Sequence, residues 1–377
     1  MKRTIVVGAG NMGRKWVRTV AAHPATEPVG LVDLDVTLAR GVARAELGDR
    51  AVAIGASLEQ VAAETSADVV IDATLPNAHR EITVAALRSG LAVLGEKPAA
   101  PTLAEALALA ALAEETGGVF VVSQSRRFNA QLAAVRRFVA ESDHLGELSV
   151  RFFRGPRFGG FREEMASPLV VDMAIHLFDM ARWLVGRAPV AVYARETNPP
   201  WSWYRGAASA RAIVEFGGGV DVVFDGSWAE LGLDTSWNGD WRISTDRGSV
   251  AWNGDEPATV QADRGTRPVV LAPDPDSAEG LSGSLSAFLA ALETGTVAEN
   301  EIHDNVRSLA IVEAVLASSA SGERVLIDDV LEAARDDARA HAESWGMPEI
   351  RPALDRWPTV AAGLDLWLPD ARAATSP

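Results

Sequence analysis

The sequence predicts two domains, an α/β domain followed by an α+β domain, and three observations support this. Over residues 1–125, short apolar stretches alternate with amphipathic helical patterns. After residue 126, strand patterns follow one another directly, separated by turn signals such as Gly217-Gly218-Gly219. A length of 377 residues also suits two domains. We therefore expect one domain over 1–125 and a second over 126–377.

The first domain alternates strands and helices along its whole length. Strands are expected at 3–10, 27–35, 67–74, 91–98 and 119–125, and helices at 11–24, 36–48, 58–66, 77–90 and 102–115. Strands that are joined through helices pair in parallel, and the helices then cover both faces of the sheet. This order predicts a buried parallel sheet.

The second domain shows a different order of elements. After a helix at 129–147, strands are expected at 148–155, 188–196, 210–228 (as a hairpin), 241–252, 258–265 and 267–273, and helices at 284–294 and 305–322. Consecutive strands joined by tight turns pair antiparallel. We expect a large, mostly antiparallel, open-faced sheet with a helix over 170–180 packed against it.

Composition excludes several functions. The chain has 51 acidic and 35 basic residues, a net charge of −16, which disfavours binding to nucleic acid or to an anionic membrane. It has no cysteine, so it forms neither a disulfide nor a thiolate metal site. The N-terminus lacks the apolar core of a signal peptide, and no run of about 18 uncharged apolar residues occurs. A cytoplasmic enzyme acting on small molecules is the expected class.

A glycine pattern marks the first strand-to-helix turn. It reads Gly8-Ala9-Gly10-Asn11-Met12-Gly13, which is G-x-G-x-x-G. The pattern follows an apolar strand and opens a helix, the context in which such glycines permit a tight turn and close approach of a pyrophosphate. The helix N-terminus adds backbone N–H donors and a positive dipole. We predict a Rossmann domain whose cofactor contacts include Gly8, Gly10, Asn11, Met12 and Gly13.

Asp33 indicates which dinucleotide is bound. It lies about twenty residues after Gly13, at the end of the second strand, where a carboxylate accepts hydrogen bonds from ribose hydroxyls. A 2′-phosphate would be repelled there, so NAD is the expected cofactor. Arg40 is near enough in sequence to leave NADP as the alternative.

The segment 170–180 combines an apolar background with three polar side chains. On an α-helix at about 100° per residue, Asp172, His176 and Asp179 fall within about 60° of one another. Ionised side chains are rarely buried without partners, because desolvation costs several kcal/mol per ion. These three residues therefore need either a chemical function or a partner.

Two further motifs follow the fourth and fifth strands: Thr74, Pro76, Asn77 and His79, and then Glu96, Lys97 and Pro98. They resemble motifs of the Gfo/Idh/MocA oxidoreductases, a family named for glucose–fructose oxidoreductase and inositol dehydrogenase. The segment 170–180 also fits the family's second-domain motif, in which an Asp, a His and an Asp are spaced four and three residues apart. The resemblance covers Met1 to about Asp329. One departure is Ala174, where many members have glycine, and this bears on how closely the backbone approaches the substrate.

The resemblance implies that Lys97, Asp172 and His176 form a catalytic trio for hydride transfer between a secondary alcohol and a nicotinamide. The chemistry of the residues agrees, because a histidine suits acid–base catalysis near neutral pH and a lysine stabilises a developing alkoxide. Asp172 can orient the imidazole or hold a substrate hydroxyl. The alternative for His176 is a hydrogen-bonded histidine of the core. Asp179 is expected to be structural, pairing with Arg182 or Lys97.

The resemblance also extends the cofactor site. The cofactor contacts that it implies are Thr74, Pro76, Asn77, His79, Glu96 and Lys97. The counterpart of His79 lies near the nicotinamide in family members, and Glu96 is either a cofactor contact or an anchor for the turn before Pro98. The polar residues of segment 170–180 lack a fourth ligand at short spacing, and hydride transfer needs no metal, so no metal is expected.

Aromatic and basic residues bear on the substrate. Six of the eleven tryptophans fall in the sheet region of the second domain, at Trp201, Trp203, Trp228, Trp237, Trp241 and Trp252. Exposed rings stack on sugar faces, and the alternative is that these rings fill the core or a subunit interface. Trp201 and Trp203 are the expected substrate contacts. The resemblance adds an active-site lining of Arg126, Arg127, Arg157 and Arg162, of which we select Arg126 and Arg157.

The expected function is NAD-dependent oxidation, or the reverse reduction, at a secondary alcohol carbon of a sugar, glycoside or inositol. One alternative is an NADPH-linked sugar reductase of the same fold. Another is a non-catalytic sugar or dinucleotide sensor, which predicts loss of the trio, whereas all three residues are present. The resemblance further implies a homodimer or homotetramer formed through the open face of the second-domain sheet.

Overall fold

The computed structural model describes residues 1–273, 275 and 277–367, and the chain forms two compact units. Unit 1 comprises Met1–Ser125, Gly280–Val306 and the described residues from Leu331 onward, and unit 2 comprises Arg126–Glu279 and Arg307–Val330. The chain first passes between the units after residue 125, where the sequence pattern changes. It then returns to unit 1 twice, which differs from the expected division into 1–125 and 126–377.

Helix α9 (Gly280–Thr294) shows why the chain returns to unit 1. Its residues Leu285, Phe288 and Leu289 belong to the same buried cluster as Val6 of the first strand. An amphipathic helix is stabilised mainly by the surface that its apolar face contacts. Helix α9 therefore belongs to unit 1, although the strands of unit 2 precede it in the sequence.

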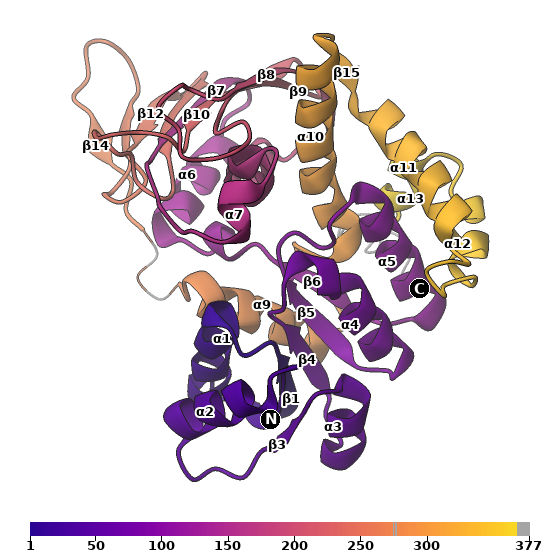
Figure 1. Cartoon of the computed structure of the whole chain (residues 1–377). Coiled ribbons are helices and arrows are strands. Elements are labelled where there is room, and N and C mark those ends of the chain that lie inside the picture. The colour runs from indigo at the N-terminus through magenta and orange to yellow at the C-terminus, as the bar shows by residue number, and fades with distance from the viewer. Residues whose placement is uncertain (274, 276, 368–377) are drawn as a thin grey trace. The chain divides into compact units, whose positions relative to one another are not determined.

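Unit 1 is built on a six-stranded parallel sheet with the order β3-β2-β1-β4-β5-β6 (Figure 1). The strands are β1 (Lys2–Val7), β2 (Thr26–Val32), β3 (Ala53–Gly55), β4 (Val69–Asp72), β5 (Ala92–Glu96) and β6 (Phe120–Ser123). This Rossmann order reverses direction between β1 and β4, and ligands bind at the carboxyl ends of the strands beside such a reversal. The sequence predicts five of the strands; β3 is too short to show a hydrophobic period.

The helices of unit 1 alternate with its strands as predicted. They are α1 (Asn11–Ala22), α2 (Val36–Leu47), α3 (Leu58–Thr65), α4 (Pro76–Arg88) and α5 (Leu103–Thr116). The later segments add α9, α12 (Ile350–Arg356), α13 (Val360–Asp365), the start of α10 (Ile302–Ser321) and most of α11 (Ile327–His341). Helix α5 is apolar on all sides because α4 and α12 both pack against it. Among the described residues, no helix combines the length and apolarity that crossing a membrane requires.

Unit 2 contains a nine-stranded sheet with the order β14-β13-β12-β11-β7-β10-β9-β8-β15. The strands are β7 (Leu145–Phe153), β8 (Pro189–Thr197), β9 (Ser209–Phe216), β10 (Val220–Ser227), β11 (Asp240–Thr245), β12 (Gly248–Trp252), β13 (Thr259–Gln261), β14 (Val269–Val270) and β15 (Val325–Leu326). Strands β7 and β10 pair in parallel, and the other pairs are antiparallel. The expected mostly antiparallel sheet is confirmed.

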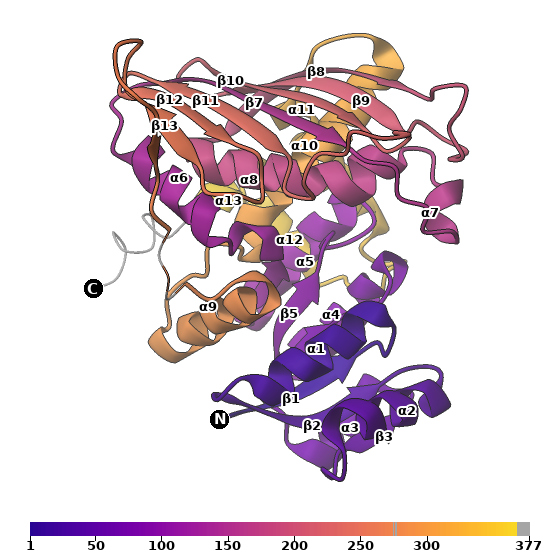
Figure 2. The same ribbon diagram turned by 90° about the vertical axis from the view of Figure 1, so that its left-hand side faces the viewer.

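Figure 2 shows helices α6 and α8 lying along one face of this sheet. The helices with residues in unit 2 are α6 (Ala130–Ala140), α7 (Phe161–Glu164), α8 (Ile175–Val185), α10 (Ile302–Ser321) and α11 (Ile327–His341). Phe178 of α8 packs edge-on against Phe224 of β10 at 5.3 Å between ring centroids. On the opposite face, Val190, Tyr193 and Ile213 are exposed. The helix expected at 129–147 ends earlier, because the last residues of that range begin β7.

The segment before α8 departs from the expected single α-helix. Residues Leu169–Ala174 form a π-helix, and α8 starts at Ile175. The wider turn changes the angle between residues on either side of it, so the stripe predicted at 100° per residue does not hold. From Leu169 to Arg182, the side chains that are not buried are those of Val171, Asp172 and His176.

Candidate active site

The turn between β1 and α1 has the geometry that the glycine pattern predicts. Gly8 has a φ of +95°, and a Cβ there would lie 2.7 Å from the carbonyl oxygen of Ala73. A Cβ on Gly13 would lie 1.8 Å from the carbonyl oxygen of Gly8, which is impossible without moving the turn. A Cβ on Gly10 would meet open space. The turn thus needs glycine at two positions for its own shape and keeps the backbone accessible at the third.

The first turn of α1 is suited to an anion. Its N-cap, Gly10, makes no side-chain capping bond, and no acidic residue lies in the first turn. The N–H groups that begin a helix lack partners within the helix and carry the positive end of its dipole. The exposed Asn11 and the partly exposed Met12 begin this turn. A pyrophosphate therefore fits here, as in other Rossmann domains.

Asp33 follows β2 and is held by two backbone groups. Its Oδ2 accepts a hydrogen bond from the N–H of Ala9 at 2.7 Å, and its Oδ1 accepts one from the N–H of Asp35 at 2.8 Å. The first of these bonds connects the carboxylate to the glycine turn. A carboxylate fixed beside the turn is oriented to receive ribose hydroxyls, which fits NAD.

The turn between β4 and α4 is organised by Asp72 and His79. The buried Asp72 accepts hydrogen bonds at its Oδ1 from the backbone N–H (3.0 Å) and the hydroxyl (2.6 Å) of Thr74. Burial raises the pKa of Asp72, which His79 and Thr74 partly oppose. The ring nitrogens of His79 lie 2.8 Å from the carbonyl oxygen of Pro98 and 3.2 Å from that of Thr74. His79 thus connects two turns at the carboxyl edge of the sheet.

Pro76 and Asn77 open helix α4, and neither is buried. Pro76 occupies the first helical position, where its missing N–H costs nothing. Both residues follow the β4 strand directly and so lie at the edge where Rossmann domains bind their cofactor.

Glu96 ends β5 and is tied to α1. Its Oε1 accepts a hydrogen bond from the indole N–H of Trp16 at 2.8 Å, and burial raises its pKa, opposed by Trp16 and Lys97. This hydrogen bond ties the end of β5 to α1, and the expected cofactor contact of Glu96 stays a prediction. Lys97 follows it, is partly exposed, and precedes Pro98 through a cis peptide.

In unit 2, Asp172 forms an ion pair with Arg162, whose Nε lies 2.5 Å from Asp172 Oδ2. Arg162 belongs to the short helix α7, ten residues earlier. His176 lies on the first turn of α8 and is partly exposed. Asp172 and His176 are therefore the polar side chains of this segment that solvent reaches.

Asp179 lies on the buried side of α8 and has a structural environment. Its oxygens accept hydrogen bonds from Arg127 Nε (2.5 Å) and Nη2 (2.7 Å) and from the Ser308 hydroxyl (2.7 Å). The expected ion pair with Arg182 or Lys97 is wrong: Arg182 instead donates to the same Ser308 hydroxyl at 3.1 Å. Arg127 lies 52 residues away in sequence, so no local pattern could have identified it.

Arg126 and a loop tryptophan form a second polar group in unit 2. Arg126 Nη1 donates to the carbonyl oxygen of Trp237 and, at 3.1 Å, to Asn238 Oδ1. Arg154 lies over the Trp237 ring at 4.4 Å from its centroid. The pKa of Arg126 is lowered to about 10, first by burial and then by the charge of Arg154, and the charge of Asp172 opposes both.

The tryptophans of unit 2 divide between core and surface. Trp228, Trp241 and Trp252 are buried, which matches the core alternative for those three. Trp201 is 59% exposed although its indole N–H donates to Ala229. Trp203 donates to the Pro156 carbonyl at 3.1 Å. The guanidinium of Arg157 lies 3.9 Å from the centroid of the Trp203 ring. These last three residues form a surface group separate from the sheet core.

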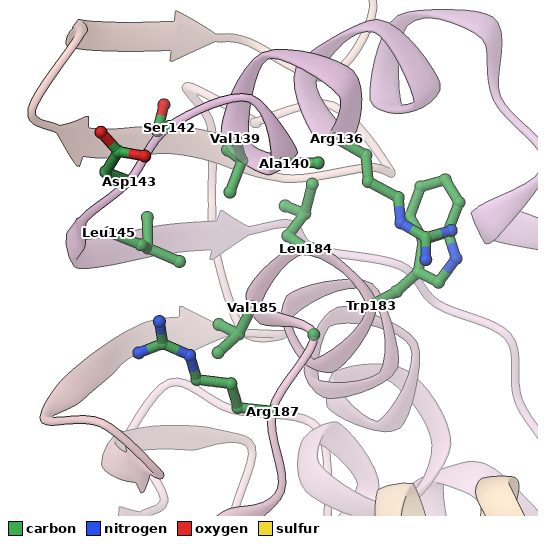
Figure 3. Close-up of a pocket in the computed structure, with 11 residues that line it drawn as sticks. Arg136, Val139, Ala140, Ser142, Asp143, Leu145, Trp183, Leu184, Val185 and Arg187 are labelled. Carbon is green, nitrogen blue, oxygen red and sulfur yellow. The ribbon is translucent and has the colours of Figure 1, made fainter. Parts of the chain in front are cut away.

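Figure 3 shows a pocket of about 270 Å³ at the far end of α8 from His176. Arg136, Trp183 and Arg187 are among the residues lining it. None of the site residues predicted from the sequence lies on it, so it is distinct from the candidate active site.

A Rossmann unit with a dinucleotide turn, and a second unit with a partly exposed aspartate and histidine, fit the class of a nicotinamide-dependent oxidoreductase. Residues 2–124 match the model of an oxidoreductase family with an NAD-binding Rossmann fold, and residues 140–251 match the GFO/IDH/MocA C-terminal domain. The chain therefore belongs to the Gfo/Idh/MocA family and is an NAD(P)-dependent dehydrogenase, as its sequence predicts.

Relatives cover nearly the whole chain. D-apiose dehydrogenase of Paraburkholderia graminis is 27% identical over 85% of this chain and 88% of its own. Inositol 2-dehydrogenase of Rhizobium meliloti is 24% identical over 85% and 98%. An oxidoreductase structure from Agrobacterium radiobacter, solved with NAD+, L-tartaric acid and magnesium, superposes with a TM-score of 0.79 at 19% identity over 88% and 99%. At 19% identity, this last similarity shows a shared fold.

Proposed function

We propose that this protein oxidises a secondary alcohol carbon of a sugar, glycoside or inositol with NAD, or performs the reverse reduction. The observation that carries the proposal is the environment of Asp172 and His176. They are the polar side chains left accessible on an otherwise buried segment, whereas Asp179 of the same segment is enclosed by Arg127 and Ser308. An imidazole that solvent reaches, with a carboxylate four residues earlier in the same segment, is suited to proton transfer near neutral pH.

NAD, when bound, would supply the hydride acceptor for the carbon that is oxidised. His176 takes the proton of the substrate hydroxyl as the C–H bond breaks and the C=O bond forms. Asp172, fixed by its ion pair with Arg162 at 2.5 Å, orients the substrate or the imidazole. Lys97 donates a hydrogen bond to the reacting oxygen, and its charge stabilises the developing alkoxide.

The cofactor is held through unit 1. The glycine turn and the first turn of α1 receive the pyrophosphate, and Asp33 receives the ribose hydroxyls. Thr74, Pro76 and Asn77 contact the nicotinamide half of the cofactor. His79 keeps this turn in position, because its ring nitrogens lie at hydrogen-bond distance from the carbonyl oxygens of Thr74 and Pro98. Replacing Asp33 with Ser removes the charge that repels a 2′-phosphate, so relative affinity for NADP should rise in D33S.

The proposal is tested with a panel of inositols, aldoses and glycosides, following the absorbance of NADH. Turnover is expected for at least one polyol class, with loss of kcat in both Lys97→Ala and His176→Ala. In His176→Ala, which removes no cofactor contact, NAD affinity should stay within about twofold. Unchanged turnover in both variants would contradict the mechanism. NAD binding without turnover of any panel member would instead favour the sensor.

We further propose that the chain forms a homodimer or homotetramer through the open face of the unit 2 sheet. The exposed Val190, Tyr193 and Ile213 on that face support this, because exposed apolar groups mark association surfaces. Light scattering of the wild type and of Tyr193→Glu tests it, and a monomeric wild type would refute it.

A further inference from the structure

Arg126 is a partly buried cation whose hydrogen bonds go to neutral groups. It donates to the Trp237 carbonyl and Asn238 Oδ1, and its Nη2 approaches the sulfur of Met173 at 3.9 Å. Among the described residues, none forms an ion pair with Arg126 within 4.0 Å. Partial burial of a guanidinium without an ion-pair partner within 4.0 Å costs free energy, and an anion bound from outside the chain would offset that cost.

A second guanidinium adds to this positive charge. Arg154 lies 4.4 Å from the Trp237 centroid, and Arg126 lies 6.0 Å from the same centroid. The carboxylate of Asp234 is 3.4 Å from Arg154 but is itself exposed, which weakens its effect. The pKa of Arg126 is lowered first by burial and then by Arg154. The two cations are therefore close enough to repel each other in a chain whose net charge is −16.

The positive group formed by Arg126 and Arg154 lies next to Asp172, which is proposed for catalysis. Met173, which Arg126 contacts, follows Asp172 directly, and the charge of Asp172 acts on Arg126. An aromatic surface borders the group: Phe158 packs against Trp237 at 6.2 Å between centroids, and Arg162 lies 5.3 Å from the Phe158 centroid. A sugar ring resting on these aromatic side chains would bring one end near Arg126 and another near Asp172.

We propose that the substrate is anionic, a sugar acid whose carboxylate is bound by Arg126. This inference rests on the proposed function, because it assigns the substrate class of the same site. The planar fork of a guanidinium matches the two oxygens of a carboxylate, and such charge-assisted pairs are about twice as strong as neutral hydrogen bonds. Arg154 supplies long-range attraction. A sugar phosphate offers the same oxyanion chemistry, and the experiment separates the two.

The experiment measures binding by calorimetry to the full chain saturated with NADH, so that it does not depend on turnover. The probes are D-gluconate and D-glucuronate, their neutral counterparts D-glucitol and D-glucose, and D-glucose 6-phosphate. The acids should bind at least about tenfold more tightly than the neutral probes. Arg126→Gln should reduce acid affinity by about 10- to 100-fold, as expected for loss of hydrogen bonds to a charged group, and leave neutral probes unchanged.

Two variants serve as controls. Arg126→Lys keeps the positive charge but loses the planar fork, so it should retain part of the acid affinity. Retained acid affinity in Arg126→Lys would show that the loss in Arg126→Gln comes from the missing charge and not from misfolding. Arg136→Gln removes a guanidinium that also lies over a tryptophan, at 4.2 Å from Trp183, and should change nothing.

The outcomes separate this inference from the proposed function. Equal affinity for acids and neutral sugars, an equal loss of both in Arg126→Gln, or no binding of any probe would overturn it. Binding of the phosphate alone would replace the carboxylate by a phosphate and also overturn it as stated. Selective acid binding without NADH formation from any polyol or sugar acid would uphold the anion site and refute the dehydrogenase mechanism.

Discussion

The cofactor turn of unit 1 and the Asp172–His176 segment of unit 2 are built in opposite ways. The turn is one contiguous motif, and its shape depends on missing side chains at Gly8 and Gly13. In the unit 2 segment, Asp172 and Asp179 are defined by partners 10, 52 and 129 residues distant. A site made of backbone can be recognised from a short motif, whereas a site made of side chains depends on contacts that only folding creates.

The largest effect should follow from Gly13→Ala in the cofactor turn. The added Cβ would lie 1.8 Å from the Gly8 carbonyl oxygen, so the turn must move. Affinity for NAD, measured by calorimetry, should fall by about 100-fold or more, because displacing positioning groups by about 1 Å has effects of that size. Gly41→Ala is the matched control, since a Cβ there meets nothing within 4 Å. Retained NAD binding in Gly13→Ala would show that the turn is not the cofactor site.

His176→Ala in unit 2 should leave NAD binding intact and remove catalysis. Loss of a general acid–base reduces kcat by about 10²- to 10⁴-fold. The measurement is kcat with the best substrate of the panel, together with NAD affinity. His144→Ala, which removes an exposed histidine, is the control. If His144→Ala and His176→Ala had the same kcat, His176 would have no catalytic role beyond that of an exposed histidine.

Asp179→Asn should destabilise unit 2 rather than alter chemistry. Breaking a buried ion pair by removing one partner costs about 3–5 kcal/mol in free energy of unfolding. The Arg127–Asp179 pair is almost fully buried, with side chains 3% and 1% exposed. Asp240→Asn breaks the exposed Arg151–Asp240 pair and should cost about 1 kcal/mol or less. Urea denaturation measures both; equal costs would argue against a structural role for Asp179.

The smallest effect is a pH dependence in unit 1. His303 is buried between Glu301 and Glu114, at 2.9 and 3.2 Å. Burial lowers its pKa, but the two carboxylates outweigh burial and the pKa is raised above its usual 6.5. A raised folded-state pKa gives stability that is complete below the unfolded pKa and is lost as pH rises through the folded value.

In the wild type, the thermal midpoint should therefore decrease as the pH rises from about 6.5 to the raised pKa of His303. His303→Gln should remove this part of the pH dependence, whereas His341→Gln, on the exposed surface of α11, should not. A pH profile that is the same in the wild type and His303→Gln would disprove the assignment.

Much of the fold could be predicted because its signals are local. Alternating periodicity predicted five parallel strands and their helices, and hairpin turns predicted the antiparallel sheet. The strand β3 and the π-helix before α8 were not predictable, since a three-residue strand shows no period and one extra residue in a helical turn leaves no composition signal. Helix α9 was assigned to the wrong unit because periodicity gives the apolar face of a helix but not the surface that covers it.

The sequence by itself determined the dinucleotide turn and the class of enzyme. It also determined that the charged side chains of segment 170–180 need a partner or a chemical function. Tertiary structure decided which of its acids is accessible: Asp172 pairs with Arg162 near the surface, while Asp179 is enclosed by Arg127 and Ser308. It also brought Arg126 and Arg154 to one tryptophan ring. The reason is physical. Glycine geometry and periodicity act over a few residues, whereas burial and ion pairing depend on segments that meet only in the folded chain.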